Sequence, residues 1–163
     1  MGNPLKTIVV LSDTHGYRQA INKLYGLFKE NDYIIHLGDG NRDMLEVYRD
    51  FPKKTYVCQG NCDYSTIYSK SEWEIQIEGC KFFCTHGHKY SVKTTLEYLT
   101  EEAKKRNASA ALYGHTHIAT IEKKDNILIC NPGCAGLYTS QPSYAYIVVN
   151  GNRITSTIVP ILP

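Results

Sequence analysis

The sequence predicts an α/β fold of two stacked, mixed β-sheets with helices on their outer faces. Up to residue 63, short apolar runs alternate with helical patterns, which is typical of parallel strands joined by crossover helices. The second half consists mainly of hairpins. Together these halves give about ten strands, more than one sheet commonly holds without splitting into two layers. The length of 163 residues favours one domain over residues 1–163.

The first half is expected to alternate strands and helices. The β-branched run Thr7–Leu11 predicts a buried strand, and Tyr17–Glu30 repeats apolar side chains at the spacing of one helix face. Two further strands, Tyr33–Leu37 and Thr55–Cys58, enclose a shorter helix over Arg42–Asp50. Because ligands bind beyond the carboxyl ends of such strands, the residues that follow each strand are expected to lie together.

The second half is expected to pair mainly antiparallel strands. Glu72–Ile77 alternates polar and apolar residues and turns into Lys81–Thr85 across a Glu-Gly pair. A helix over Thr94–Arg106 and a strand over Ser109–Tyr113 follow. Turn residues then predict two more hairpins, Ile118–Lys123 with Ile127–Cys130 and Ser143–Val149 with Arg153–Val159.

Five glycine-bounded clusters of acidic, amide and imidazole side chains follow predicted strands. In chain order they are Asp13-Thr14-His15-Gly16, Gly38-Asp39-Gly40, Gly60-Asn61-Cys62-Asp63, His86-Gly87-His88 and Gly114-His115-Thr116-His117. Carboxylate oxygens and imidazole nitrogens are ligands for divalent cations. In extended backbone, side chains two residues apart point the same way, so the Asp-x-His and His-x-His pairs could each hold one cation. One such cluster alone also fits a turn or a helix cap, but the set favours metal.

Seven side chains form the candidate ligand set. They are Asp13, His15, Asp39, Asn61, His86, His115 and His117. Seven ligands exceed what one cation takes from protein, and they suit two cations that share Asp39, an arrangement used to hydrolyse phosphate esters. The predicted chemistry is in-line attack on phosphorus by a hydroxide that bridges the metals. His36 lies inside an apolar run and is expected to support a ligand rather than to bind metal.

As a set, these motifs resemble those of the calcineurin-like metallophosphoesterases. The segments Thr85-His86-Gly87-His88 and Asn131-Pro132-Gly133 are most similar to the small branch labelled YfcE-type phosphodiesterases. The resemblance implies an αββα sandwich and a phosphodiesterase that acts on small phosphate esters. It also implies two divalent ions per chain, with Mn²⁺ first and iron, nickel or zinc as alternatives. By the same resemblance, Asp39 bridges a first metal held by Asp13, His15 and His117 and a second held by Asn61, His86 and His115.

One departure from the family pattern affects the catalytic role that would accompany Asp39 and Asn61. Cys62 stands where the family has a histidine that is credited with protonating the leaving group. A thiol with an ordinary pKa near ~8.5 is a poorer match for that role, and His88 is the nearest replacement. Asp63 is expected to orient a neighbouring ligand. Cys134 also departs from the family's serine and, like Cys62, is expected to face the centre.

Two other functions remain open from the sequence. One is a non-catalytic scaffold that resembles the retromer subunit and binds partner proteins, although such relatives lose metal ligands and all seven remain here. The other is a binding surface built from aromatic residues. Its candidates are Tyr64, Tyr68, Trp73, Tyr138 and Tyr144. Packing at the edge of the core is the alternative explanation for these rings.

Composition argues against several partners. The net charge is +2 without a basic stripe, so no nucleic acid is expected as a partner. No signal peptide and no long apolar run are present, which favours the cytoplasm and no membrane contact. The cysteines form three equally spaced pairs, which permits a zinc site but favours buried thiols. The family resemblance implies that a homo-oligomer could form.

Overall fold

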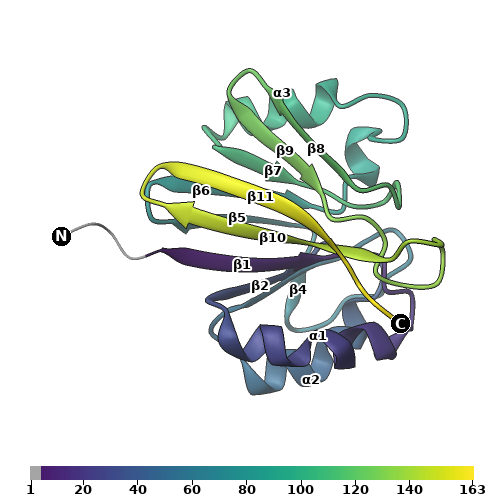
Figure 1. The fold of residues 1–163 in the computed structure, drawn as a ribbon. Helices are drawn as coiled ribbons and strands as arrows, with labels where there is room; N and C mark the ends of the chain where they lie inside the picture. The colour runs from purple at the N-terminus through teal and green to yellow at the C-terminus, as the bar shows by residue number, and fades with distance from the viewer. Residues whose placement is uncertain (1–4) are drawn as a thin grey trace.

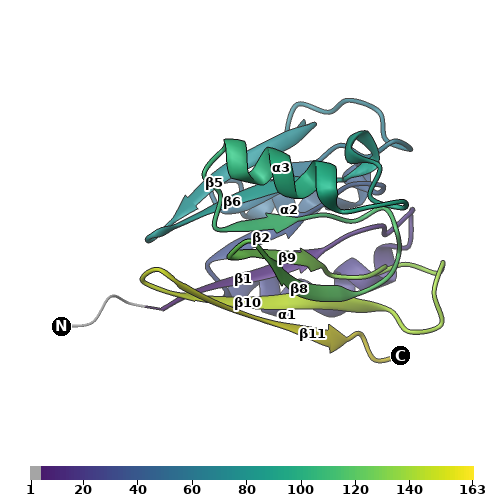
Figure 2. The same cartoon turned by 90° about the horizontal axis from the view of Figure 1, so that it is seen from above.

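The computed structural model describes residues 5–163 and consists of two β-sheets packed face to face, with helices on both outer faces (Figure 1). Helices α1 (Arg18–Glu30) and α2 (Leu45–Asp50) cover the first sheet, and α3 (Glu97–Lys105) covers the second (Figure 2). The predicted two-sheet α/β architecture is confirmed. Within residues 5–163, no helix combines the length and apolar character that crossing a membrane requires.

The first sheet has six strands in the order β11-β10-β1-β2-β3-β4. They are β1 (Lys6–Leu11), β2 (Tyr33–His36), β3 (Thr55–Cys58), β4 (Ser69–Lys70), β10 (Ser143–Asn150) and β11 (Arg153–Pro160). Strands β1 to β4 are parallel, as the alternation predicts, whereas β10 pairs antiparallel with β1. Strand β4 was not predicted, because two residues are too few to show a periodic pattern.

The second sheet has five strands in the order β5-β6-β7-β9-β8. They are β5 (Glu72–Ile77), β6 (Cys80–Thr85), β7 (Ala110–Leu112), β8 (Thr120–Lys124) and β9 (Ile127–Asn131). The hairpins β5–β6 and β8–β9 are antiparallel, and β7 runs parallel to both of its neighbours. The third predicted hairpin, β10–β11, pairs antiparallel in the first sheet, so all three hairpins of the second half are confirmed.

Two of the three predicted helices, α2 and α3, begin three residues later than predicted, whereas α1 begins one residue later. The predicted helix Arg42–Asp50 opens with a 3₁₀ turn, η1 (Asn41–Met44), before α2 begins. Helix α3 begins three residues after the predicted Thr94, because the chain first turns at Ser91, which has a positive φ of 53°. Thr94 and Thr95 donate their backbone N–H groups back to the carbonyl of Ser91, so a separate turn precedes the helix. A second 3₁₀ turn, η2 (His88–Tyr90), follows β6.

Three hydrophobic layers hold this arrangement together. The central layer lies between the two sheets and includes Val10, Phe82 and Leu112, all fully buried. The outer layers pack α1 and α3 against their sheets, with Phe28 and Leu99 as fully buried anchors. Because burying a large apolar side chain contributes about 1.5–3 kcal/mol, these layers fix both sheets and the loops that leave them.

Most of the cysteines belong to the central layer. Cys58, Cys80, Cys84 and Cys130 lie there among apolar side chains, and all six cysteines are free thiols. Burial raises the pKa of the Cys84 and Cys130 thiols, the latter to about 12. The expectation of buried thiols in these strands is confirmed.

Candidate metal centre

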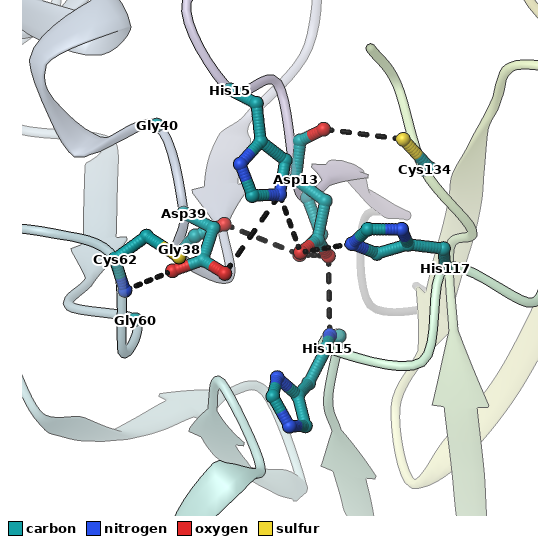
Figure 3. Close-up of polar contacts among 12 residues, drawn as sticks. Asp13, His15, Gly38, Asp39, Gly40, Gly60, Cys62, His115, His117 and Cys134 are labelled. Carbon is teal, nitrogen blue, oxygen red and sulfur yellow. Dashed lines mark hydrogen bonds and ion pairs between the residues drawn. The ribbon is translucent and has the colours of Figure 1, made fainter. Parts of the chain in front are cut away.

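The loops that follow strands β1, β2, β3, β6 and β7 meet at one end of the two sheets. Backbone hydrogen bonds join them: Asp13 donates to the carbonyl of Gly38 and His15 to that of Asp39, both at 2.9 Å. Gly114 donates to the carbonyl of His86 across the second sheet, also at 2.9 Å. The predicted convergence of the clusters is therefore observed, and Figure 3 shows the side chains of Asp13, His15, Asp39 and His117 directed toward one another.

Asp13, His15 and His117 form the first ligand group, whose ligand atoms lie within 4.8 Å of one another. Asp13 Oδ1 is 3.2 Å from His117 Nε2 and 3.5 Å from His15 Nε2 (Figure 3). Oδ1 of Asp13 and Nε2 of His15 are both buried and have no hydrogen-bond partner in the described chain. Because an unsatisfied buried polar group is costly, a cation coordinated by both atoms fits this group.

Asp39, His86 and His115 form the second ligand group, again within 4.8 Å. Asp39 Oδ2 is 3.2 Å from His86 Nε2, which is itself 3.2 Å from His115 Nδ1. His86 Nδ1 contacts the carbonyl of Leu37 at 2.9 Å, and since a carbonyl only accepts, Nδ1 carries the hydrogen. This bond leaves His86 Nε2 to face the centre, as a metal ligand requires.

Asp39 lies between the two groups. Its Oδ2 is 3.8 Å from His15 Nε2 in the first group and 3.2 Å from His86 Nε2 in the second. Its other oxygen, Oδ1, accepts the backbone N–H of Cys62 at 2.8 Å. Burial alone would raise the pKa of Asp39, but the hydrogen bond and the charge of His86 lower it below the ordinary range. Asp39 is therefore ionised, with one oxygen directed at both groups.

The backbone at the ligands differs from the extended geometry assumed from the sequence. Asp13, His15, Asp39, His115 and His117 all have a positive φ, between 44° and 70°. This left-handed region is uncommon for residues other than glycine, and such residues cluster at functional sites. The assumption of an extended Asp-x-His and His-x-His segment was wrong. The side chains converge because the chain turns sharply after each strand.

Asp63 joins the loop that carries Asp39 to the loop after β3. Its carboxylate accepts four backbone N–H groups at 2.8–3.1 Å, those of Asp39, Gly40, Asn41 and Gly60. A Cβ at Gly60 would collide with the Asp39 carboxylate, so the two loops can approach this closely only with glycine there. From this position Asp63 could orient the ligand Asp39 through its backbone N–H, and that role stays a prediction.

His36 supports the turn that carries the first ligands. Its Nδ1 accepts the N–H of Gly38 at 3.0 Å, so its Nε2 carries the hydrogen and donates to Thr14 Oγ1, also at 3.0 Å. Thr14 in turn donates to Asp43 Oδ2 at 2.6 Å. Burial lowers the pKa of His36, in agreement with a neutral ring. Both ring nitrogens take part in these hydrogen bonds, so neither can coordinate a cation.

The sequence suggested that Cys134 faces the centre, but its side chain does not. Its buried thiol lies 3.2 Å from the backbone carbonyl of Asp13 and donates to it (Figure 3). Ser12 likewise donates its hydroxyl to Asp13 Oδ2 at 2.6 Å. Sequence reasoning missed Ser12, Thr14 and Asp43, because only the folded loops bring these common polar residues into contact with the ligand turns.

Cys62 lies at the exposed rim of the centre. Its sulfur falls within 4.8 Å of ligand atoms of His15 and Asp39, and burial is the largest cause that raises the pKa of the thiol. Asn61 is also exposed, and its amide nitrogen lies 3.5 Å from the sulfur of Cys62. Asn61 thus lies in the same rim loop, and its coordination of metal stays a prediction.

His88 flanks the second ligand group. Its ring centroid is 5.4 Å from that of His86 and 6.1 Å from that of His115. Its Nδ1 is buried without a hydrogen-bond partner in the described chain. This position keeps His88 next to the centre, and its catalytic role stays a prediction.

A pocket of about 390 Å³ opens beside the two groups and is lined by Asp39, Cys62, Arg42, Tyr64 and Tyr138, among others. Of the five aromatic residues considered from the sequence, only Tyr64 and Tyr138 line this pocket. Tyr68 and Tyr144 are buried, and Trp73 donates its indole N–H to the carbonyl of Val57. These three rings pack at the core edge instead.

The chain is similar in sequence to known phosphoesterases. A sequence profile of the calcineurin-like phosphoesterase superfamily domain matches residues 7–152. The phosphodiesterase MJ0936 of Methanocaldococcus jannaschii is 29% identical over 154 residues, which cover 83% of this chain and 89% of the relative.

Two solved structures have the same fold. A predicted phosphoesterase from Streptococcus pneumoniae superposes with a TM-score of 0.82 at 22% identity, over 99% of this chain and 95% of the other. Vacuolar Protein Sorting 29 from Cryptosporidium parvum superposes with a TM-score of 0.80 at 16% identity, over 99% and 100%. At these identities the likeness shows the fold alone.

Proposed function

Because the chain belongs to the calcineurin-like phosphoesterase superfamily, we propose that it is a phosphodiesterase that depends on two divalent metal ions. The position of Asp39 carries the proposal, since one carboxylate oxygen faces both ligand groups at 3.2 and 3.8 Å. A carboxylate placed in this way suits a pair of cations. The relative named a phosphodiesterase supports diesters as the substrate class.

The side chains present fit such ions. Asp13, His15 and His117 would hold one ion and Asp39, His86 and His115 the other, with Asn61 as a further predicted ligand. Mixed carboxylate and imidazole ligands suit Mn²⁺, and iron, nickel and zinc also accept them. When bound, two such ions would supply Lewis-acid chemistry, which polarises phosphoryl oxygens and makes water a stronger nucleophile.

Residues of the chain keep the acidic ligand Asp13 ionised and hold the turns that carry the ligands in position. The neighbouring imidazole of His15 and the positive charge of His86 keep the pKa of Asp13 low against its burial, so its carboxylate is available to a cation. Asp63 and His36 hold the turns that carry the ligands. Cys62 and His88 border the centre from the loops after β3 and β6, and they are the two candidates to donate a proton to the leaving oxygen.

The experiment removes all metal with a chelator and then adds back Mn²⁺, Fe²⁺, Ni²⁺ or Zn²⁺ one at a time. Turnover of bis(4-nitrophenyl) phosphate is compared with that of 4-nitrophenyl phosphate. We expect no turnover without metal, recovery with Mn²⁺ and a preference for the diester. Asp39→Asn should lower turnover by about 100-fold or more, because several kcal/mol of charge stabilisation is lost.

Asp50→Asn provides the matched control, because Asp50 is exposed at the end of α2 and away from the ligand groups. It should keep wild-type turnover. If the Asp39→Asn variant kept wild-type turnover with Mn²⁺, the proposed mechanism would be wrong.

The second candidate is the non-catalytic, protein-binding scaffold. The structural likeness to Vacuolar Protein Sorting 29 is the observation that favours it, at the level of the fold. A folded protein that turns over neither ester with any of the four metals would favour the scaffold over the enzyme. The cytoplasmic location and self-association expected from the sequence stay predictions.

A further inference from the structure

Three side chains line the pocket beside the centre without belonging to either ligand group: Arg42, Tyr64 and Tyr138. We propose that the two tyrosines bind a planar aromatic group of the substrate while Arg42 attracts its anionic phosphoryl group, so that the enzyme selects diesters with an aryl or nucleobase group over aliphatic diesters. This inference rests on the proposed function. The pocket volume of about 390 Å³ is near the lower end of small-molecule sites, which span roughly 300–1,000 Å³, and fits one such group rather than a polymer.

Tyr138 is anchored on the first ligand group. Its ring centroid lies 4.7 Å from that of His15, at an interplanar angle of 69°, and 5.8 Å from that of His117, at 39°. The side chain nevertheless stays 66% exposed. A phosphoryl group held at the ligand groups would therefore bring its ester substituent to the open surface of this ring.

Tyr64 and Arg42 form a second surface of the same pocket. The guanidinium carbon of Arg42 lies 5.3 Å from the centroid of the Tyr64 ring, which is 73% exposed. Within residues 5–163, Arg42 forms no ion pair. The carboxylate of its neighbour Asp43 has other partners: it accepts hydrogen bonds from Thr14 and Gly16 and forms an ion pair with Arg18. Arg42 thus offers a guanidinium group without an ion-pair partner beside an aromatic face, which suits an anionic ester.

The two aromatic surfaces belong to loops on opposite sides of the ligand groups. Figure 3 shows Cys62, two residues before Tyr64, and Cys134, four residues before Tyr138, with Asp13 and Asp39 between them. Tyr64 and Tyr138 come from these two loops, and both line the pocket beside the centre. Two exposed rings that line one concave surface are typical of a binding site rather than of core packing.

Flat rings favour flat ligands. Contact between a tyrosine ring and an aromatic ring of the ligand adds to the effect of the buried area. This addition raises the affinity by about two- to tenfold per tyrosine. We therefore expect an aromatic ester to bind about tenfold more tightly than an aliphatic one when both carry the same anionic phosphoryl group. The positive charge of Arg42 acts on that shared anion and should favour both ligands equally.

The test uses two symmetrical phosphinates, diphenylphosphinate and diethylphosphinate, which carry the same charge and have no ester bond to hydrolyse. Calorimetry measures their affinities for the Mn²⁺-loaded wild-type protein and for Tyr138→Leu, Tyr64→Leu and Arg42→Gln. Tyr98→Leu is the matched control, since Tyr98 is 61% exposed on α3 and does not line the pocket. Leucine keeps the apolar character of each side chain but removes the ring.

We expect the ratio of the two affinities to fall by about two- to tenfold in Tyr138→Leu and Tyr64→Leu and to stay at the wild-type value in Tyr98→Leu. Arg42→Gln should weaken both phosphinates by similar factors and leave the ratio unchanged. A wild-type ratio near one, or a ratio that both tyrosine variants leave unchanged, would overturn the inference. Hydrolysis of bis(4-nitrophenyl) phosphate is measured in parallel. Its absence would refute the proposed enzyme, whereas the affinity ratio tests the pocket independently of turnover.

Discussion

The Asp63→Asn substitution should loosen the contact between the loops after β2 and β3. Each carboxylate oxygen of Asp63 accepts two backbone N–H groups. Asparagine has one acceptor oxygen, and its NH₂ group cannot accept. Whichever way the amide turns, two backbone donors lose their partner and face a donor instead.

The structure sets the size of this effect. These hydrogen bonds are partly buried, so the loss of each one should lower the free energy of unfolding by about 1–1.5 kcal/mol. The loss of both bonds to one oxygen should lower it by about 2–3 kcal/mol. For a chain of this length, 1 kcal/mol shifts the melting temperature by about 2–4 °C, so we expect a decrease of about 4–12 °C. Because one of the two pairs includes the N–H of Asp39, the affinity for Mn²⁺ should also fall, by about 10- to 100-fold.

Thermal unfolding of the metal-free protein and calorimetric titration with Mn²⁺ measure the two effects separately. Asp50→Asn makes the same chemical change on an exposed residue and should leave both values unaltered. If the Asp63→Asn variant had the same melting temperature as the Asp50→Asn control, the four hydrogen bonds of Asp63 would not stabilise the fold. If it melted earlier but bound Mn²⁺ normally, Asp63 would not position the Asp39 ligand.

Three further predictions concern the ligands, the glycines and the pH dependence. Saturating Mn²⁺ at about 100 times its dissociation constant should raise the free energy of unfolding by about 2.7 kcal/mol for each occupied site, and a melting temperature independent of metal would argue against binding to the folded state. Gly60→Ala should lower Mn²⁺ affinity and diester turnover about tenfold or more, because the new Cβ collides with Asp39; Gly26→Ala in α1 meets no atom within 4 Å and should stabilise the helix by about 0.5–1 kcal/mol instead. Burial and the hydrogen bond to Glu72 raise the pKa of Tyr90, so its contribution to stability is present below pH ~10 and is lost as pH rises above that value. Urea unfolding at pH 9 and 11 should show a smaller loss of stability in Tyr90→Phe than in the wild type, and an equal loss would contradict this account.

Much of the fold could be predicted from the sequence, because its signals are local and periodic. The parallel strands at Thr7–Leu11, Tyr33–Leu37 and Thr55–Cys58 are apolar runs separated by a helical pattern, and the hairpins carry turn residues. The short strand β4 could not be predicted, since its two residues pair with β3 only once the loop has folded over it. The late start of α3 depends on a positive φ at Ser91, which leaves no periodic signal.

The convergence of the ligands followed from topology, but their geometry did not. Strand ends meet at one edge of a parallel sheet, so Asp13, Asp39 and Asn61, which follow β1, β2 and β3, could be placed together in advance. The left-handed backbone at the ligands could not be foreseen from an Asp-x-His spacing. Nor could the contact of Cys134 with the Asp13 carbonyl, because it joins residues 121 positions apart.

The central claim is that two cations bind on either side of Asp39. Anomalous diffraction from crystals of the Mn²⁺-loaded protein tests it most directly. We expect two manganese peaks, one contacted by Asp13 and His117 and the other by His86 and His115, with the Asp39 carboxylate between them. A single peak, or two peaks that Asp39 does not contact, would contradict it.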